Sequence, residues 1–367
     1  MYLSKLSLLG FKNYEEAELQ FSKHINCFVG NNGEGKTNLL DAIHYLAFCK
    51  SFFNPNDSQN IYHNNPFFVI QGEFLNGDDS KDDIYCGFKR NEKKQFKKNK
   101  KEYARLAEHI GSIPLVMVSP ADSELITEGS ESRRKFVDSA IAQFDKSYLE
   151  NLLAYNKVLA HRNAVLKSFD ENRYYDKESI AIWDEQLITL GTKIHHERLL
   201  FIEKFTPIFN QYYQLISGGK EEVGLEYASQ LKEGNFADLL EAAVKKDLQL
   251  QYSSVGIHKD DLIFKINSFA VKKFGSQGQQ KSFLIALKLA QFDFLKSIKQ
   301  KTPLILLDDI YDKLDESRVQ QLMQLVSSEG FGQIFITDTH QDRIARIFKK
   351  IKTDFKLFKI KNGNVEA

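Results

Sequence analysis

The sequence predicts an α/β fold that is interrupted by a helical domain, and two observations predict this class. Towards both ends of the chain, short apolar segments typical of strands, such as 26–29, alternate with segments of helical apolar spacing. Between them, residues 131–217 contain almost no proline or glycine and keep a helical spacing of apolar side chains. We therefore expect a discontinuous α/β domain over residues 1–120 and 250–367, with a helical insertion over residues 121–249.

The individual elements follow from the same periodicities. Strands are expected at residues 3–9, 18–21, 26–29, 67–74, 83–88, 114–118, 262–266, 303–307 and 333–337. Helices are expected at 37–48, within 131–217, at 279–298 and at 317–327. A lysine-rich hairpin follows the strand at 83–88, and Ser217-Gly218-Gly219 closes the helical stretch.

Bulk composition limits the class of protein without choosing a function. The 367 residues are 42% hydrophobic and 27% charged, as in globular proteins with a buried core. The net charge of +1 means that any basic surface must be local. Cys27, Cys49 and Cys86 form no CxxC pair, so neither a disulfide framework nor a zinc site is expected. No apolar run approaches the roughly 20 residues that span a bilayer, and we expect a cytoplasmic location.

A phosphate-binding loop follows the strand at 26–29. The segment GNNGEGKT fits G-x-x-x-x-G-K-[ST] and opens a helix, which is the context that this pattern requires. Its backbone amides can surround phosphates, Lys36 can reach the β- and γ-phosphates, and the Thr37 hydroxyl can bind Mg²⁺. The residues expected to bind nucleotide here are Gly30, Asn31, Asn32, Gly33, Glu34, Gly35, Lys36, Thr37 and Asn38.

A second motif places two carboxylates at the end of an apolar strand. The segment LILLDD ends in Asp308 and Asp309. We expect Asp308 to hold Mg²⁺ together with Thr37, and Asp309 to act in catalysis by polarising the attacking water. Small kinases share these two motifs, so together they indicate nucleotide binding and leave the subclass open.

The segment Ser276-Gln277-Gly278-Gln279 indicates the subclass. It begins a predicted helix about 30 residues before the acidic strand, as the signature of ABC-type ATPases does. Ser276, Gly278 and Gln279 are expected to contact the γ-phosphate of a second copy, with support from the helix dipole. One copy cannot complete its own site in this way, so the motif predicts an ATP-dependent homodimer that encloses two nucleotides.

The order of further motifs is that of ABC-type ATPases. After the acidic strand, Leu314-Asp315 matches a loop that crosses the dimer interface, and Asp315 is expected to contact nucleotide. His340 follows the next strand, where these proteins place a histidine that senses the γ-phosphate and acts in catalysis.

Five segments together resemble the RecF family, and the resemblance covers nearly the whole chain. They are residues 30–43, the paired-arginine segment 133–138, His161-Arg162-Asn163, Gly256-Ile257-His258-Lys259-Asp260-Asp261 and Ser276-Gln277-Gly278-Gln279-Gln280. Ile257 and Lys259 stand where the family has proline and arginine, and Ala121 stands where it usually has glutamate.

The resemblance implies an ABC-type, Rad50/SMC-head-like P-loop ATPase head, with a helical second domain in place of a long coiled coil. It implies ATP and Mg²⁺ as cofactors, and slow DNA-stimulated hydrolysis that resets a DNA-bound dimer. It also implies a role in recombinational repair and replication-fork maintenance, in which RecA is loaded at gaps together with RecO and RecR.

A basic segment is the candidate DNA contact. Lys93, Lys94, Lys97, Lys98, Lys100 and Lys101 fall within nine residues, a density that suits nonspecific contact with phosphates. Arg133 and Arg134 extend the candidate surface onto the helical insertion. No motif that contacts base edges is visible, so recognition of duplex DNA or strand junctions without sequence preference is expected. A solvated hairpin tip remains the alternative interpretation of the lysines.

The sequence disfavours two other functions. A nucleotide-binding subunit of an ABC transporter is disfavoured because the signature lacks a double glycine, Asp309 stands in place of the usual glutamate, and the insertion is too long. A structural SMC-like protein would need hundreds of residues of heptad repeats, for which the chain has no room.

Overall fold

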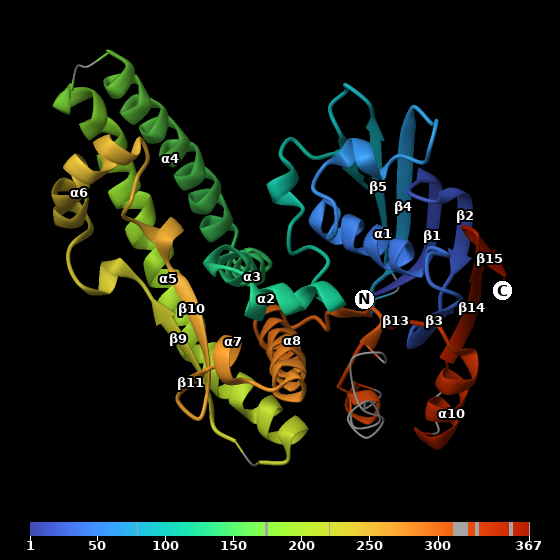
Figure 1. Ribbon diagram of the computed structural model, residues 1–367. Coiled ribbons are helices and arrows are strands. Elements are labelled where there is room, and N and C mark those ends of the chain that lie inside the picture. The colour runs from blue at the N-terminus through green and yellow to red at the C-terminus, as the bar shows by residue number, and fades with distance from the viewer. Residues whose placement is uncertain are drawn as a thin grey trace. The chain divides into compact units, whose positions relative to one another are not determined.

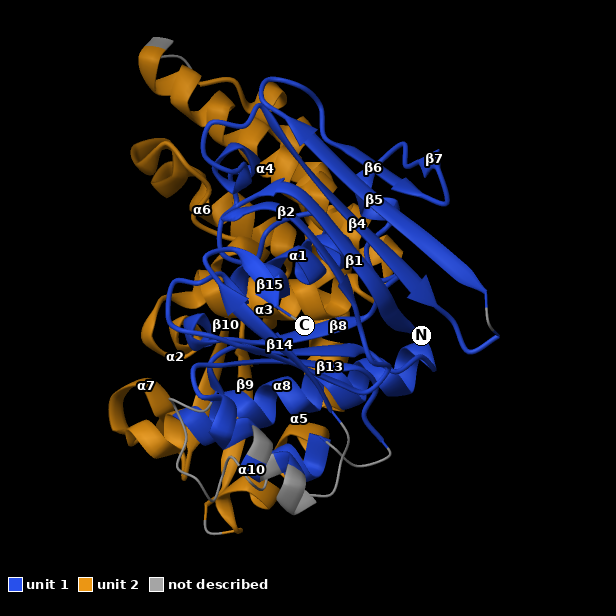
Figure 2. Cartoon of the chain, turned by 90° about the vertical axis from the view of Figure 1, so that its right-hand side faces the viewer, with its two compact units in different colours: residues 1–122, 281–367 blue, residues 123–280 orange. Residues whose placement is uncertain are grey.

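The computed structural model describes residues 1–78, 80–172, 175–219, 221–310, 322–326, 330–351 and 355–366. The chain forms two compact units, which Figure 2 shows in different colours. Unit 1 consists of Met1–Asp122 and Lys281–Ala367, and unit 2 of Ser123–Gln280. An α/β unit that is discontinuous in sequence, with a largely helical insertion, is the predicted fold class.

The insertion extends further than the predicted end at residue 249. Strand β10 (Asp261–Ile266) pairs along its whole length with β9 (Val223–Ala228), so it belongs to unit 2. The strand at 262–266 was expected in the α/β domain, because periodicity predicts a strand without indicating its partner.

A mainly parallel sheet in unit 1 places the predicted nucleotide-binding motifs at the ends of its strands. Its order in the described chain is β15-β14-β3-β13-β12-β8. Strands β3, β12 and β13 are buried throughout, as is typical of parallel strands covered on both faces. The bounds are β3 (Ile25–Val29), β8 (Leu115–Val118), β12 (Leu304–Leu307), β13 (Ile334–Asp338), β14 (Phe355–Lys361) and β15 (Asn364–Glu366).

An antiparallel sheet forms the other layer of unit 1. In the described residues its order is β2-β1-β4-β5-β6-β7, from β1 (Tyr2–Phe11), β2 (Tyr14–Gln20), β4 (Phe67–Leu75), β5 (Lys81–Lys89), β6 (Gln95–Lys98) and β7 (Lys101–Glu102). Helix α1 (Lys36–Phe48) contacts strands of both sheets (Figure 1). One core of unit 1 therefore joins Leu6 of β1, Ile43 of α1 and Phe335 of β13. Unit 1 also contains the short 3-10 helices η1 (Asp57–Asn60) and η2 (Leu106–Glu108), all but the last residue of η3 (Pro120–Ser123), and helix α10 (Gln341–Ile351).

Unit 2 is built on two long helices, α4 (Lys146–Asn172) and α5 (Lys177–Ser217), which pack side by side (Figure 1). Gly191 of α5 permits a close approach, because a Cβ there would lie 2.6 Å from the Phe236 ring. The remaining elements are α2 (Glu124–Thr127), α3 (Ser130–Ala142), α6 (Phe236–Leu250), α7 (Val271–Phe274), η4 (Gln230–Lys232), η5 (Ile257–Lys259) and β11 (Phe269–Ala270).

Helix α8 (Gln277–Lys299) begins at the end of unit 2 and continues into unit 1. Within the predicted helix at 317–327, residues 322–326 are helical and the rest lie outside the described residues. Among the helices of the described chain, none combines the length and the apolar character needed to cross a membrane.

Candidate functional site

Three parallel strands bring the phosphate loop, the acidic pair and His340 to one edge of the unit 1 sheet. Strand β3 leads into Gly30, β12 into Asp308, and β13 ends at Asp338, two residues before His340. The register pairs Val29 with Asp338, so the carboxyl ends of these strands lie level. Ligands of parallel α/β sheets bind at this edge, because loops and helix N-termini gather there.

The phosphate loop is closed by its own lysine. The Lys36 ammonium donates to the carbonyl oxygens of Gly30 at 2.8 Å and Asn31 at 2.9 Å, and the side chain is only 4% exposed. Gly33 and Gly35 have φ of 84° and 113°, a backbone conformation that favours glycine. The loop can therefore present its amides and the N-terminus of α1 to an anion.

Asn13, in the turn between β1 and β2, supports the loop from outside. Its amide donates to the Glu34 carbonyl oxygen at 2.9 Å and accepts from Asn38 Nδ2 at 2.8 Å. A Cβ on Gly35 would lie 2.4 Å from Asn13 Nδ2, so this contact also requires the glycine. Nothing in the sequence indicated Asn13, because a polar residue in a β-turn is ordinary.

The predicted magnesium residues meet at Asp308. Its Oδ1 accepts from the Thr37 hydroxyl at 2.8 Å and from the Thr337 hydroxyl at 2.9 Å. Burial raises the pKa of the Asp308 carboxyl to about 6, although both hydroxyl bonds and Lys36 oppose this shift. Thr337 was missed from the sequence, where the only signal was a hydroxyl residue at the end of an apolar strand.

These oxygen donors fit Mg²⁺ in company with a nucleotide. A hydroxyl beside a carboxylate suits this hard cation, which usually takes few protein ligands and completes its shell with water and phosphate oxygens. Among the described residues, no group of three or more His, Cys, Asp or Glu side chains could hold a metal alone.

Asp309 and His340 lie at the same edge of the sheet. The Asp309 amide donates to Thr337 Oγ1 at 2.8 Å, and its φ of 44° is left-handed. The His340 amide donates to Asp338 Oδ1 at 2.9 Å, while its ring lies 2.7 Å from the Thr339 hydroxyl and its side chain is 71% exposed. Both predicted catalytic residues therefore follow strands that end at the same edge of the sheet as β3, the strand that leads into the phosphate loop.

The signature segment lies at the start of α8, within unit 2. Ser276 is exposed, and its hydroxyl accepts from the Gln279 amide N–H at 3.2 Å. The Gln279 side chain is engaged inside the unit, with Ser276 N–H at 2.6 Å and Glu221 at 2.6 Å. Gly278 lies in the first turn of the helix. Asp315 lies outside the described residues.

The lysine hairpin of β5, β6 and β7 divides into two groups. Lys93, Lys100 and Lys101 are exposed, and Lys97 is half-buried with its ammonium over the Tyr85 ring. Two others form ion pairs, Lys94 with Asp57 of η1 at 2.7 Å and Lys98 with Asp82 of β5 at 2.9 Å. The first group is better placed for phosphate contact than the second.

The paired arginines are bound inside unit 2. Arg133 forms two bonds to the Asp261 carboxylate, at 2.7 and 2.9 Å, and Arg134 donates to the Asp260 carbonyl oxygen at 2.7 Å. These contacts differ from the DNA contact expected from the sequence, because each guanidinium already binds a protein acceptor.

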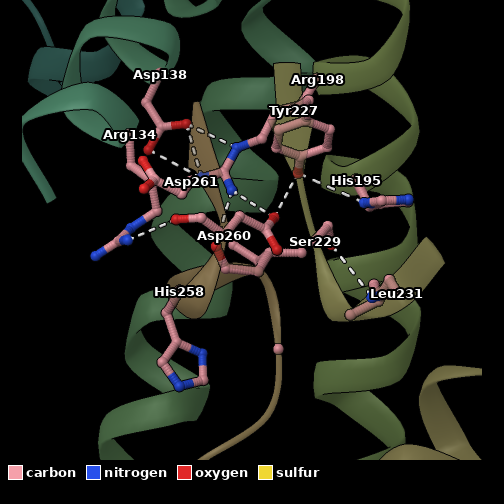
Figure 3. A network of polar contacts seen from close by, with 12 residues as sticks. Arg134, Asp138, His195, Arg198, Tyr227, Ser229, Leu231, His258, Asp260 and Asp261 are labelled. Atoms are coloured by element: carbon pink, nitrogen blue, oxygen red, sulfur yellow. Dashed lines mark hydrogen bonds and ion pairs between the residues drawn. The ribbon is translucent and has the colours of Figure 1, made fainter. Parts of the chain in front are cut away.

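The arginines adjoin a buried ionic network, which Figure 3 shows. Arg198 of α5, 2% exposed, donates to Asp138 at 2.9 Å and to Asp260 at 3.0 Å. Tyr227 also donates to the Asp260 carboxylate. The segment Gly256–Asp261 thus supplies carboxylates that tie η5 and β10 to α3 and α5. Lys259 is exposed, with its ammonium 4.8 Å from the centre of the Tyr252 ring.

The sheet and its edge define the class of an ABC-type ATPase head. The RecF/RecN/SMC N-terminal domain family matches residues 2–365. An SMC head bound to the C-terminal winged-helix domain of ScpA has a similar fold, with a TM-score of 0.58, 16% identity, and coverage of 100% of this chain and 96% of that one.

Full-length relatives narrow the class. The DNA replication and repair protein RecF of Phocaeicola vulgatus is 52% identical over 366 residues, which cover 100% of this chain and 98% of the relative. That of Flavobacterium johnsoniae is 52% identical over 360 residues, covering 98% and 100%. A solved structure of the recombination mediator protein RecF with ATP, in the RecFOR pathway, has a TM-score of 0.89, 29% identity and coverage of 100% and 97%. The chain belongs to the RecF family of DNA replication and repair proteins. The transporter alternative is not favoured by these relatives.

Proposed function

We propose that this protein is an ATP-switched DNA-binding protein of recombinational repair and replication-fork maintenance. The observation that carries the proposal is the meeting of Lys36, Thr37 and Asp308 at the edge of the sheet, with Asp309 and His340 beside them. This arrangement suits binding of a nucleoside triphosphate with Mg²⁺. The family membership connects such binding with DNA repair.

Hydrolysis is slow and acts as a timer. Thr37 and Asp308 would hold Mg²⁺, which neutralises charge on the phosphates when it is bound. Lys36 binds phosphate oxygens, Asp309 polarises the attacking water, and His340 senses the γ-phosphate. The protein is accordingly a weak, DNA-stimulated ATPase in which the ATP-bound form acts on DNA and hydrolysis ends that form.

ATP joins two copies, each of which completes the other's site. The exposed Ser276 hydroxyl and the Gly278 amide, at a helix N-terminus, suit contact with the γ-phosphate held by the other copy. Asp315 is proposed to contact nucleotide at the same interface. Two ATP molecules are then enclosed, and their hydrolysis releases the dimer.

The dimer binds duplex DNA or strand junctions without sequence preference. The exposed lysines of the β5–β6–β7 hairpin support this part of the proposal. A solved RecF structure belongs to the RecFOR pathway, which supports RecO and RecR as partners. Loading of RecA at gaps, in the cytoplasm, completes the proposal.

The test is the molar mass of the purified protein in solution, by sedimentation or light scattering. A monomer that becomes a dimer with ATP and Mg²⁺, and then retains duplex DNA, is expected. Ser276→Arg should bind ATP as a monomer and fail to dimerise, because the larger cation occupies the space of the partner's phosphate. A wild-type mass that ignores ATP would contradict the proposal, as would an S276R variant that dimerises normally.

A further inference from the structure

The signature segment is shaped by a reciprocal pair of hydrogen bonds. Ser276 Oγ accepts from the backbone N–H of Gln279 at 3.2 Å, and Gln279 Oε1 accepts from the backbone N–H of Ser276 at 2.6 Å. This is a capping box, with serine at the N-cap and glutamine three residues later. Because the serine oxygen acts as acceptor here, its own proton can be donated to an anionic oxygen.

Glu221 binds the opposite end of the same glutamine. Gln279 Nε2 donates to Glu221 Oε1 at 2.6 Å, and the buried Tyr213 hydroxyl of α5 donates to Glu221 Oε2. Glu221 lies just before β9, so three segments of unit 2 meet at one carboxylate. The carboxylate is fixed by α5 and in turn fixes the glutamine.

The carboxylate determines which way the amide faces. A glutamine amide can rotate by 180° and exchange its oxygen and nitrogen, and only one orientation places Oε1 against the Ser276 N–H. An ionised carboxylate accepts hydrogen bonds and donates none. Glu221 can therefore form a hydrogen bond with the Gln279 side chain only when Nε2 faces it. The same orientation closes the capping box.

We propose that Glu221 is the positioning residue of the signature, holding Gln279 in the orientation that presents the Ser276 hydroxyl to a second copy's γ-phosphate. This role rests on the proposed function, since it concerns the contact that the signature makes between copies. Glu221 acts through Gln279 and touches no nucleotide itself.

The first test compares Glu221→Ala with Glu222→Ala, which removes an exposed carboxylate one residue along the chain. Dimerisation with ATP and Mg²⁺ is measured by sedimentation over a range of protein concentrations. Glu221→Ala should raise the dimer dissociation constant about tenfold, the size expected when a hydrogen bond of ordinary strength is lost. Glu222→Ala should match the wild type.

A charge exchange separates positioning from general loss of structure. Gln279→Glu keeps a residue that suits a capping box but faces Glu221 with a second carboxylate, so dimerisation should weaken. Adding Glu221→Gln places an amide donor at position 221 opposite the carboxylate at position 279, so the hydrogen bond between the two side chains is restored with its direction reversed. The double variant should therefore dimerise more tightly than Gln279→Glu alone. Without this rescue the positioning role is wrong.

The outcomes also distinguish this role from the function on which it rests. A wild-type protein that stays monomeric with ATP overturns the proposed function, and with it this role. A wild type that dimerises while Glu221→Ala dimerises equally well overturns the role of Glu221 alone.

Discussion

At the scale of single residues, Arg198 shows how unit 2 depends on a buried charge. Its guanidinium lies between Asp138 and Asp260, and Asp260 is 1% exposed (Figure 3). Arg198→Met removes the cation and leaves the buried Asp260 carboxylate with the Tyr227 hydroxyl but without a positive charge. Loss of one member of such a pair typically costs about 3–5 kcal/mol in the free energy of unfolding. Urea denaturation should show this loss, whereas Lys204→Met, at an exposed position of α5, should change little.

The cost of Arg198→Met should also depend on pH. Burial raises the pKa of Asp260 even with Tyr227 and Arg198 opposing the shift, and removing Arg198 raises it further. A carboxyl whose pKa is higher in the folded state adds stability below its ordinary pKa of about 3.9, and this is lost as pH rises through the folded pKa. The deficit of the variant should therefore be smaller at pH 5 than at pH 8. An equal deficit at both values would mean that the charge of Asp260 is not its cause.

At the scale of elements, the structure of the lysine hairpin predicts which of its lysines contact DNA, which the sequence alone could not. Lys93→Ala/Lys100→Ala/Lys101→Ala should weaken DNA binding and reduce the slope of log affinity against log salt by about 0.9 for each lost phosphate contact. Lys94→Ala/Lys98→Ala is the matched control, because these lysines pair with Asp57 and Asp82. Fluorescence anisotropy of labelled duplex DNA over a series of salt concentrations measures both. A larger change of the salt slope in the control variant would mean that Lys94 and Lys98, not the exposed lysines, contact DNA.

The same hairpin shows what sequence patterns can and cannot predict. Strands β3, β8, β12 and β13 are local features that the apolar patterns predicted, as is the turn from β3 into α1 that holds the phosphate loop, whereas β14 and β15 were not predicted. Ion pairs depend on residues far apart in sequence, such as Asp57 and Lys94, so periodicity could not divide the lysines. Asn13 and Thr337 also support the site through contacts between residues far apart in sequence, and each is an ordinary residue in its own segment. The end of the insertion was predicted too early in the sequence for a related reason, because β10 pairs with β9 and this pairing cannot be seen in the local pattern.

At the scale of the whole molecule, the two units carry separate natural reporters of unfolding. All three cysteines, Cys27, Cys49 and Cys86, are buried in unit 1. The chain's one tryptophan, Trp183, lies in α5 of unit 2, stacked on His161. Thiol labelling in urea therefore follows unit 1, and tryptophan fluorescence follows unit 2.

ATP with Mg²⁺ should stabilise the unit that binds it. In the Ser276→Arg background, where dimers are absent, nucleotide at about 100 times its dissociation constant should raise the unfolding free energy of unit 1 by about 2.7 kcal/mol. The urea midpoint of thiol labelling should rise, while that of tryptophan fluorescence should stay, because the phosphate loop and Asp308 belong to unit 1. Adding Lys36→Ala should remove the shift. If both midpoints rise together, the two units unfold in one cooperative transition, and nucleotide binding to the monomer then stabilises unit 2 as well as unit 1.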